Sequence, residues 1–348
     1  MPTIVRINGR GNAWPIFLGE TSPFYNTTSG DLSNASYSII SYEGENYLSG
    51  RILSEVLIDA GNNTAPFIIQ HENRIPEAVI LTHGHTDHTL GIDWVVQSYF
   101  FRNNKQKKYP LYCTRLVWDI VSRSYPQLLR AVNFTELLPA VETPVREVKG
   151  LTVTSFPVFH GDSAWGASML LFKTAEDKRV LFTGDMLCPL LRKKDYERLS
   201  DAKIMFIDSN NRFPNPGSNH ISFVRNSPRK KVDSPLLTPW LKRARFSQFL
   251  ALHACAEYVP EIHDYFDEFL SDWNSVSELP LSIVDFVKRA GVKHIIMVHY
   301  SGWADKVNYK EPVLSGSELK LWAQTMAAEA ELTNVLIEVP EVGACYNL

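Results

Sequence analysis

The sequence predicts a layered α/β fold in a single domain, and three observations support this prediction. Short apolar segments, each with the length of a buried strand, recur along the chain and alternate with segments of helical periodicity. Most of these apolar segments end in glycine or in a polar residue, as strands do where they open into loops. Hydrophobic residues make up 45% of the 348 residues, which is enough to bury a large core.

The N-terminal half is expected to contain four strands and two helices. The strands are predicted at residues 4–8, 35–42, 55–58 and 77–82. The first helix, at 89–101, has four side chains at helical spacing that we expect to be buried: Leu90, Trp94, Val95 and Tyr99. The second, at 115–132, is expected to be interrupted by Pro126. Gly9 and Gly11 allow the chain to turn after the first strand.

The C-terminal half repeats the alternation but contains an insertion. Strands are predicted at residues 151–159, 179–183, 203–207, 292–298 and 335–339. Helices are predicted at 282–290 and after Ser315, which forms a capping box with Glu318. Residues 211–237 are rich in Pro, Gly, Asn and Ser and are too long for a plain connection. Residues 240–273 look helical, with an interruption at Pro260, so we interpret 211–278 as an inserted loop and helical cap that could also form a homodimer interface.

Composition excludes several classes of protein. The 35 basic and 38 acidic residues give a net charge of -3, which does not favour a binder of nucleic-acid polymers or of membrane surfaces. No apolar run is long enough to span a membrane. The four cysteines lie far apart without a C-x-x-C pair, as expected for reduced thiols of a cytoplasmic protein.

The segment 81–88 carries the strongest functional signal. His83, His85, Asp87 and His88 follow an apolar strand and precede a helix, in the pattern H-x-H-x-D-H. A helix N-terminus that favours Asp would be the structural alternative. Four such residues in six positions instead indicate a metal site, because imidazole and carboxylate suit a borderline ion such as zinc.

Four more residues share this position at the end of an apolar strand. They are Asp59, His160, Asp185 and His299. Because the carboxyl ends of strands in layered α/β folds form binding sites, we expect these residues to meet the first cluster. The candidate ligands number seven, which suits two ions that share a carboxylate: His83, His85, Asp87, His88, His160, Asp185 and His299. Asp59 could be a turn residue or could fix the tautomer of a ligand histidine.

This ordered series resembles the metallo-β-lactamase superfamily of hydrolases. The motifs are D-A-G at 59–61, H-G-H-T-D-H at 83–88, H-G-D at 160–162, G-D at 184–185 and H-Y-S-G at 299–302. The resemblance implies a four-layer αββα sandwich of two pseudo-symmetric halves. It implies one metal on His83, His85 and His160, and a second on Asp87, His88 and His299. Asp185 would then bridge the two metals, and Asp59 would support the ligands from behind.

The N-terminal sequence I-N-G-R-G-N-A-W-P is similar to the opening of the tRNase Z and phosphodiesterase branch. That branch typically has a further histidine after the bridging aspartate. His220 is the positional candidate here, although its context, Ser-Asn-His-Ile-Ser, departs from the usual His-Glu motif. Asp87, which could orient a nucleophile, and His220 are the candidate catalytic residues.

The sequence therefore predicts a dinuclear metal hydrolase, with a phosphodiester such as a nucleotide as the favoured substrate. Two ions about 3.5–4 Å apart can share a hydroxide and stabilise an in-line displacement. Basic clusters at 102–108, 192–194 and 229–231 could meet a phosphate-bearing small molecule. Zinc is favoured, with manganese or iron as alternatives. A lactone or amide hydrolase and an iron-dependent oxygenase remain alternative functions, because the same ligands suit them.

Overall fold

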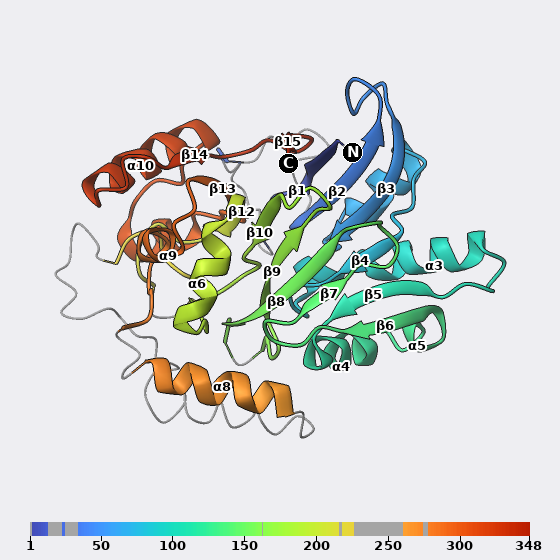
Figure 1. Cartoon of the computed structure of the whole chain (residues 1–348). Coiled ribbons are helices and arrows are strands. Elements are labelled where there is room, and N and C mark those ends of the chain that lie inside the picture. The colour runs from blue at the N-terminus through green and yellow to red at the C-terminus, as the bar shows by residue number, and fades with distance from the viewer. Residues whose placement is uncertain are drawn as a thin grey trace.

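Two facing β-sheets with helices on both outer sides make up the molecule (Figure 1). The computed structural model describes residues 2–12, 23–24, 34–161, 163–215, 218–225, 260–273 and 278–348. In Figure 1, α3, α4 and α5 cover one sheet, and α6, α9 and α10 cover the other. The four-layer αββα sandwich predicted from the sequence is thereby confirmed.

The first sheet has the strand order β15-β1-β2-β3-β4-β5-β6. The strands β1 to β3 are antiparallel, and β3 to β6 are parallel. The C-terminal strand β15 pairs with β1, which brings the two ends of the chain together. The bounds are β1 Thr3–Gly9, β2 Ser36–Glu43, β3 Arg51–Ile58, β4 Ala78–Ile80, β5 Tyr109–Cys113, β6 Val132–Glu136 and β15 Cys345–Asn347.

The second sheet repeats this pattern. Its order is β11-β8-β9-β10-β12-β13-β14, with β7 paired to β8. Again the strands β8 to β10 are antiparallel and β10 to β14 are parallel, so the two halves are pseudo-symmetric. The bounds are β7 Glu142–Pro144, β8 Thr152–Phe159, β9 Ser168–Lys173, β10 Arg179–Phe182, β11 Cys188–Pro189, β12 Ala202–Asp208, β13 His294–Val298 and β14 Leu336–Glu338.

Three apolar layers hold the sandwich together. The central layer lies between the sheets and includes Ile7 and Val56 from the first and Phe182 and Phe206 from the second. The rings of Phe182 and Phe206 stack with centroids 4.8 Å apart. Two outer layers bury the helices against their sheets. Because both faces of β4, β10 and β13 are buried, these strands are almost continuously apolar.

The helices of the two outer layers begin and end at residues suited to those positions. Ser315 and Glu318 form the predicted capping box of α10. Ser282 caps α9, and Gly291 ends it in the left-handed conformation, with φ of 71°. The bounds are α1 Thr64–Pro66, α2 Thr86–Thr89, α3 Ile92–Arg102, α4 Arg115–Ser124, α5 Leu128–Ala131, α6 Lys193–Ser200, α8 Pro260–Asp272, α9 Ile283–Ala290 and α10 Gly316–Glu329, with π-helical turns η1 Phe67–His71 and η4 Asp305–Tyr309.

The helix predicted at 89–101 differs from the prediction in which side chains it buries. The short helix α2 occupies the metal-motif segment, and the next helix, α3, begins only at Ile92. Its buried residues are Ile92, Val95 and Val96. Leu90 and Trp94, predicted to be buried, are 48% and 58% exposed. Leu90 lies in the break between the two helices and Trp94 on the exposed side of α3, so the prediction of burial is wrong for both.

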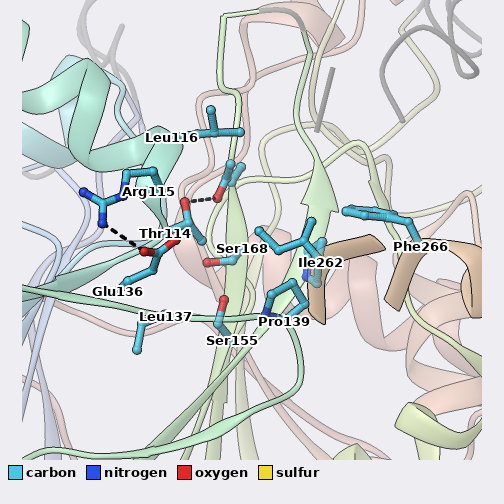
Figure 2. Close-up of a pocket in the computed structure, with 13 residues that line it drawn as sticks. Thr114, Arg115, Leu116, Glu136, Leu137, Pro139, Ser155, Ser168, Ile262 and Phe266 are labelled. Carbon is cyan, nitrogen blue, oxygen red and sulfur yellow. Dashed lines mark hydrogen bonds and ion pairs between the residues drawn. The ribbon is translucent and has the colours of Figure 1, made fainter. Parts of the chain in front are cut away.

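Part of the predicted insertion lies outside the described residues, namely 216–217, 226–259 and 274–277. Within it, the described part of α8 spans Pro260–Asp272, and the helical stretch predicted before Pro260 lies outside the described residues. Ile262 and Phe266 of α8 line a small hollow together with Pro139 and Ser168 of the sandwich (Figure 2). The helix α8 thus packs on the body of the protein. Among the described residues, no helix has the length and apolarity needed to cross a membrane.

Candidate metal centre

All seven predicted ligands, together with Asp59 and His220, lie in one site at the ends of strands. Asp59 follows β3, the cluster 83–88 follows β4, and His160 follows β8. Asp185 lies just beyond β10, and His299 directly follows β13. The residues come from both sheets, so the site forms only where the two halves of the sandwich meet.

Asp185 occupies the centre of the site. Its Oδ2 lies 3.4 Å from Nε2 of both His88 and His299. The same oxygen lies 3.7 Å from His160 Nε2 and 3.9 Å from His83 Nε2. One carboxylate oxygen therefore faces imidazoles from both halves of the ligand set, as a carboxylate shared by two ions requires.

The donor atoms fall into two groups that match the division implied by the resemblance. His83, His85 and His160 form the first group. Asp87, His88, Asp185 and His299 form the second, and all donor atoms within a group lie within 4.8 Å of one another. A third, overlapping group adds Asp208 and His220 to Asp185 and His299.

Unusual backbone conformations aim these side chains. Asp59 and His299 have φ of 54° and 67°, in the left-handed region that costs a non-glycine residue about 1–2 kcal/mol. Gly184, directly before Asp185, has φ of 56°. A Cβ at Gly184 would lie 2.8 Å from Thr82 Cβ, so only glycine lets the two loops approach this closely. Such strain is typical of functional sites.

Asp59 orients two candidate ligand histidines, one directly and one through Thr82. Its Oδ2 lies 2.7 Å from His88 Nδ1 and accepts a hydrogen bond of 2.7 Å from the Thr82 hydroxyl. Its Oδ1 accepts the Thr82 backbone N–H at 2.8 Å. Because the Thr82 hydroxyl donates to Asp59, its oxygen is left to accept from His83 Nδ1, 3.0 Å away. Both Nδ1 atoms are thereby fixed as donors, and both Nε2 atoms face Asp185.

The surroundings of these two Nε2 atoms indicate whether the site suits a metal ion. Nε2 of His83 and of His88 are buried and have no hydrogen-bond partner among the described residues. An unpaired polar atom in a buried site is costly and requires an explanation. A ligand imidazole whose other nitrogen is bound to a carboxylate or hydroxyl is the usual arrangement around a metal. The donor set therefore fits divalent ions.

His160 and His85 are oriented in the same manner by polar groups behind them. His160 Nδ1 lies 2.9 Å from the carbonyl oxygen of Asn219, and His85 Nε2 lies 2.9 Å from the Ser163 hydroxyl. The opposite nitrogens, His160 Nε2 and His85 Nδ1, face each other at 3.2 Å. Each histidine of the first group thus has one nitrogen occupied by a partner and the other directed into the site.

The two groups differ in charge. Burial lowers the pKa of His83 well below its usual value, and burial together with His220 lowers the pKa of His160 to about 3. Burial alone would also lower the pKa of His299, but the carboxylates of Asp185 and Asp208 raise it to about 10. The first group is therefore neutral, whereas the second combines carboxylates with imidazoles that retain a proton when no metal is bound.

His220 lies beside the second group and is paired with Asp208. Its Nδ1 is 2.7 Å from Asp208 Oδ2, and its ring stacks on that of His299 with centroids 5.3 Å apart. Burial opposes a proton on His220, but Asp208 raises its pKa above the usual value. Sequence reasoning missed the role of Asp208, although Asp208 ends an apolar strand, as Asp59 nearly does.

The N-terminal turn also reaches the site. Asn12 Nδ2 lies 3.2 Å from His299 Nδ1, and the His299 backbone N–H donates to the carbonyl oxygen of Arg10. The glycine-containing turn after β1 therefore lies directly behind His299. Asn12, Thr82, Ser163 and Asn219 are supporting residues that single-residue patterns did not reveal.

Comparisons with known proteins agree with this architecture. A family model described as a beta-lactamase superfamily domain matches residues 54–226, which include every predicted site residue except His299. The crystal structure of a diphosphatase from the PhnP family matches with a TM-score of 0.59 and 15% identity, covering 99% of this chain and 98% of that chain. The metallo-beta-lactamase fold protein YhfI from Bacillus subtilis matches with a TM-score of 0.56 and 13% identity over 100% of both chains.

A curated relative gives a shorter match. The endoribonuclease YSH1 of Mycosarcoma maydis is 26% identical over 134 residues, which are 34% of this chain and 15% of that protein. The present chain thus matches only a small part of that relative's length. The family match, the two pseudo-symmetric half-sandwiches and the ordered motifs agree with one another, and the chain belongs to the metallo-β-lactamase superfamily.

Proposed function

We propose that this protein is a dinuclear metal-dependent phosphodiesterase acting on a nucleotide or another small phosphodiester. The observation that carries the proposal is the position of Asp185, whose one oxygen faces His83 and His160 on one side and His88 and His299 on the other. A carboxylate in this position can serve two ions at once. The imidazole-rich donor set favours zinc, with manganese or iron as alternatives.

Each ion would have its own set of ligands. The first would be held by His83, His85 and His160, and the second by Asp87, His88 and His299, with Asp185 shared. Two bound divalent ions would polarise a phosphoryl oxygen and make a water molecule acidic enough to supply a nucleophile near neutral pH. The chain itself supplies the orientation of the ligands, through Asp59, Thr82, Ser163 and Asn219.

His220 would donate a proton to the leaving group. Asp208 accepts the Nδ1–H of His220, which fixes the tautomer and stabilises the imidazolium, so that Nε2 can carry a proton. His220 contacts the rings of both His160 and His299, and it therefore lies at the junction of the two ligand groups. Asp87, 3.2 Å from His299 Nε2, is placed to orient the nucleophile.

The substrate class is supported by the relatives. One similar structure is named a diphosphatase and one curated relative an endoribonuclease, and both names denote attack at phosphorus. These observations favour a phosphorus centre over the carbonyl carbon of a lactone.

The test is hydrolysis by zinc-loaded and manganese-loaded protein. Bis-p-nitrophenyl phosphate and a panel of cyclic nucleotides should be hydrolysed, and Asp185→Ala should abolish turnover. Asp93→Asn provides a matched control, because Asp93 lies on α3 and its carboxylate accepts a hydrogen bond only from Gln97 among the contacts described. Metal-loaded protein that leaves every phosphodiester intact but opens lactones, or that holds iron and consumes O2, would overturn the proposal.

A further inference from the structure

A second pocket lies apart from the metal centre and is lined by none of its residues. It is an open pocket with a volume of about 430 Å³, a size typical of small-molecule sites. Its walls come from α6, from α9, from the end of the segment 218–225 and from the chain on either side of residues 274–277. The lining residues are Lys193, Tyr196, Arg225, Trp273, Glu278 and Arg289.

Three cations and one carboxylate, Glu278, line this pocket, and Lys193 and Arg289 form no ion pair with a carboxylate among the described residues. Arg225 forms an ion pair with Asp285 at 2.5 Å. Lys193 Nζ instead lies 5.3 Å from the centre of the Trp273 ring, and the Arg289 guanidinium lies 4.8 Å from the same ring. A cation held against an aromatic ring is positioned without being neutralised. Lys193 and Arg289 therefore keep their charge available to an anion.

The aromatic part of the pocket is rigid. The Trp273 indole N–H donates a 2.8 Å hydrogen bond to the carbonyl oxygen of Leu191, which fixes the ring. Tyr196 meets Trp273 edge to face at 6.3 Å. Its hydroxyl is buried and has no hydrogen-bond partner among the described residues. Because this hydroxyl is inaccessible from the pocket, Tyr196 contributes to the wall through its edge-to-face contact with Trp273.

We propose that this pocket binds an organic phosphate of the size of a nucleoside monophosphate. The phosphate would lie between Lys193 and Arg289. One guanidinium can donate two parallel hydrogen bonds to two phosphate oxygens, and the lysine ammonium adds a positive charge. The base would contact the part-exposed ring of Trp273, because contacts between a base and an aromatic side chain suit any planar ring. This inference does not depend on the reaction at the metal centre.

Calorimetric titration of the full-length protein with AMP tests the proposal. The protein should bind AMP, and the substitutions Lys193→Ala and Arg289→Ala should each weaken binding about tenfold, as loss of a charge-assisted contact does. Lys194→Ala is the matched control, because Lys194 is the next residue of α6 and pairs with Glu268 outside the pocket. It should leave the affinity unchanged. Adenosine, which lacks the phosphate, should show no heat of binding.

AMP could also bind at the metal centre. Repeating the titration with the Asp185→Asn variant distinguishes binding at that centre from binding in the pocket. Binding that persists in this variant and is weakened by Lys193→Ala supports the pocket. Lys193 is the safer position, because its side chain is exposed and its removal leaves the packing of Trp273 against α9 in place. Equal affinity of the wild type and the Lys193→Ala variant, or equal binding of adenosine and AMP, would overturn the proposal.

Discussion

The substitution Asp59→Asn isolates the support behind the metal ligands without touching a ligand itself. The Asp59 carboxylate is fully buried and interacts with Thr82 N–H, the Thr82 hydroxyl and His88 Nδ1, at 2.7–2.8 Å. An asparagine can keep its oxygen toward the Thr82 N–H. Its NH2 group then faces two donors, the Thr82 hydroxyl and His88 Nδ1–H, and can satisfy neither.

The size of the effect follows from these two lost contacts. Hydrogen bonds to a charged group contribute about 1.5–3 kcal/mol each, so two lost bonds should lower the unfolding free energy of the metal-free protein by at least about 3 kcal/mol. This is less than the total stability of a typical domain, so the variant should fold. The tautomers of His83 and His88 are no longer fixed, and loss of such partners typically lowers metal affinity about 10–100-fold.

Competition against a fluorescent zinc chelator measures the affinity, and thermal unfolding of the metal-free protein measures the stability. The expected result is zinc binding weakened by one to two orders of magnitude in a folded variant. Asp93→Asn makes the same chemical change on α3, outside the site, and should bind zinc like the wild type. Wild-type zinc affinity in folded Asp59→Asn would refute the role assigned to Asp59.

Three further predictions concern other groups. His220→Ala should lower kcat about 10²–10⁴-fold with the metal content unchanged, as loss of a proton donor does; a metal analysis showing lost zinc would make His220 a ligand instead. Zinc affinity should rise as the pH approaches about 10, because the carboxylates raise the pKa of His299 to about 10. The proton on His299 must leave before the imidazole can bind a metal. An affinity that stays constant between pH 6 and 9 would contradict this prediction. Burial raises the pKa of Cys188 to about 12, so mass-spectrometric mapping of alkylated native protein should find exposed Cys345 labelled before Cys188, and the reverse order would contradict the structure.

The candidate homodimer interface in residues 211–278 also stays a prediction. Light scattering of the full chain and of a form lacking 226–259 would test it, with a halved mass expected on deletion and an unchanged dimeric mass contradicting the role of that segment. The described part, α8, packs on the sandwich through Ile262 and Phe266, while Leu270 is 46% exposed.

Much of the site could be predicted from the sequence because the ends of the strands determine where its side chains lie. An apolar run followed by a His or Asp places that side chain at a sheet edge whatever the details of the loops. Five such positions were sufficient to name every member of the two main donor groups. Asp208 was not identified because the polar residues after it, at 209–211, looked like the start of a loop and not like a functional strand end.

Several elements carried weaker signals. The strand β6, at the edge of its sheet, has only Val132 fully buried, and β5 contains Pro110, so neither shows a clear strand pattern. The supporting residues could not be predicted because their partners are distant in sequence. Ser163, for example, is brought to His85 across 78 positions, and a single sequence carries no record of that contact.

The pseudo-symmetry of the fold brings donor atoms from both halves into one site. In each half, three antiparallel strands lead into a parallel run, and an aspartate lies just beyond the third strand: Asp59 after β3 and Asp185 after β10. Asp59 approaches His88 from the Nδ1 side, and Asp185 approaches the same ring from the Nε2 side. Equivalent strand ends thus meet at the two ring nitrogens of one imidazole, one as support and one as candidate ligand. Because the strands set the positions and the following residue sets the chemistry, a single change such as Asp59→Asn should weaken metal binding while leaving the sandwich intact.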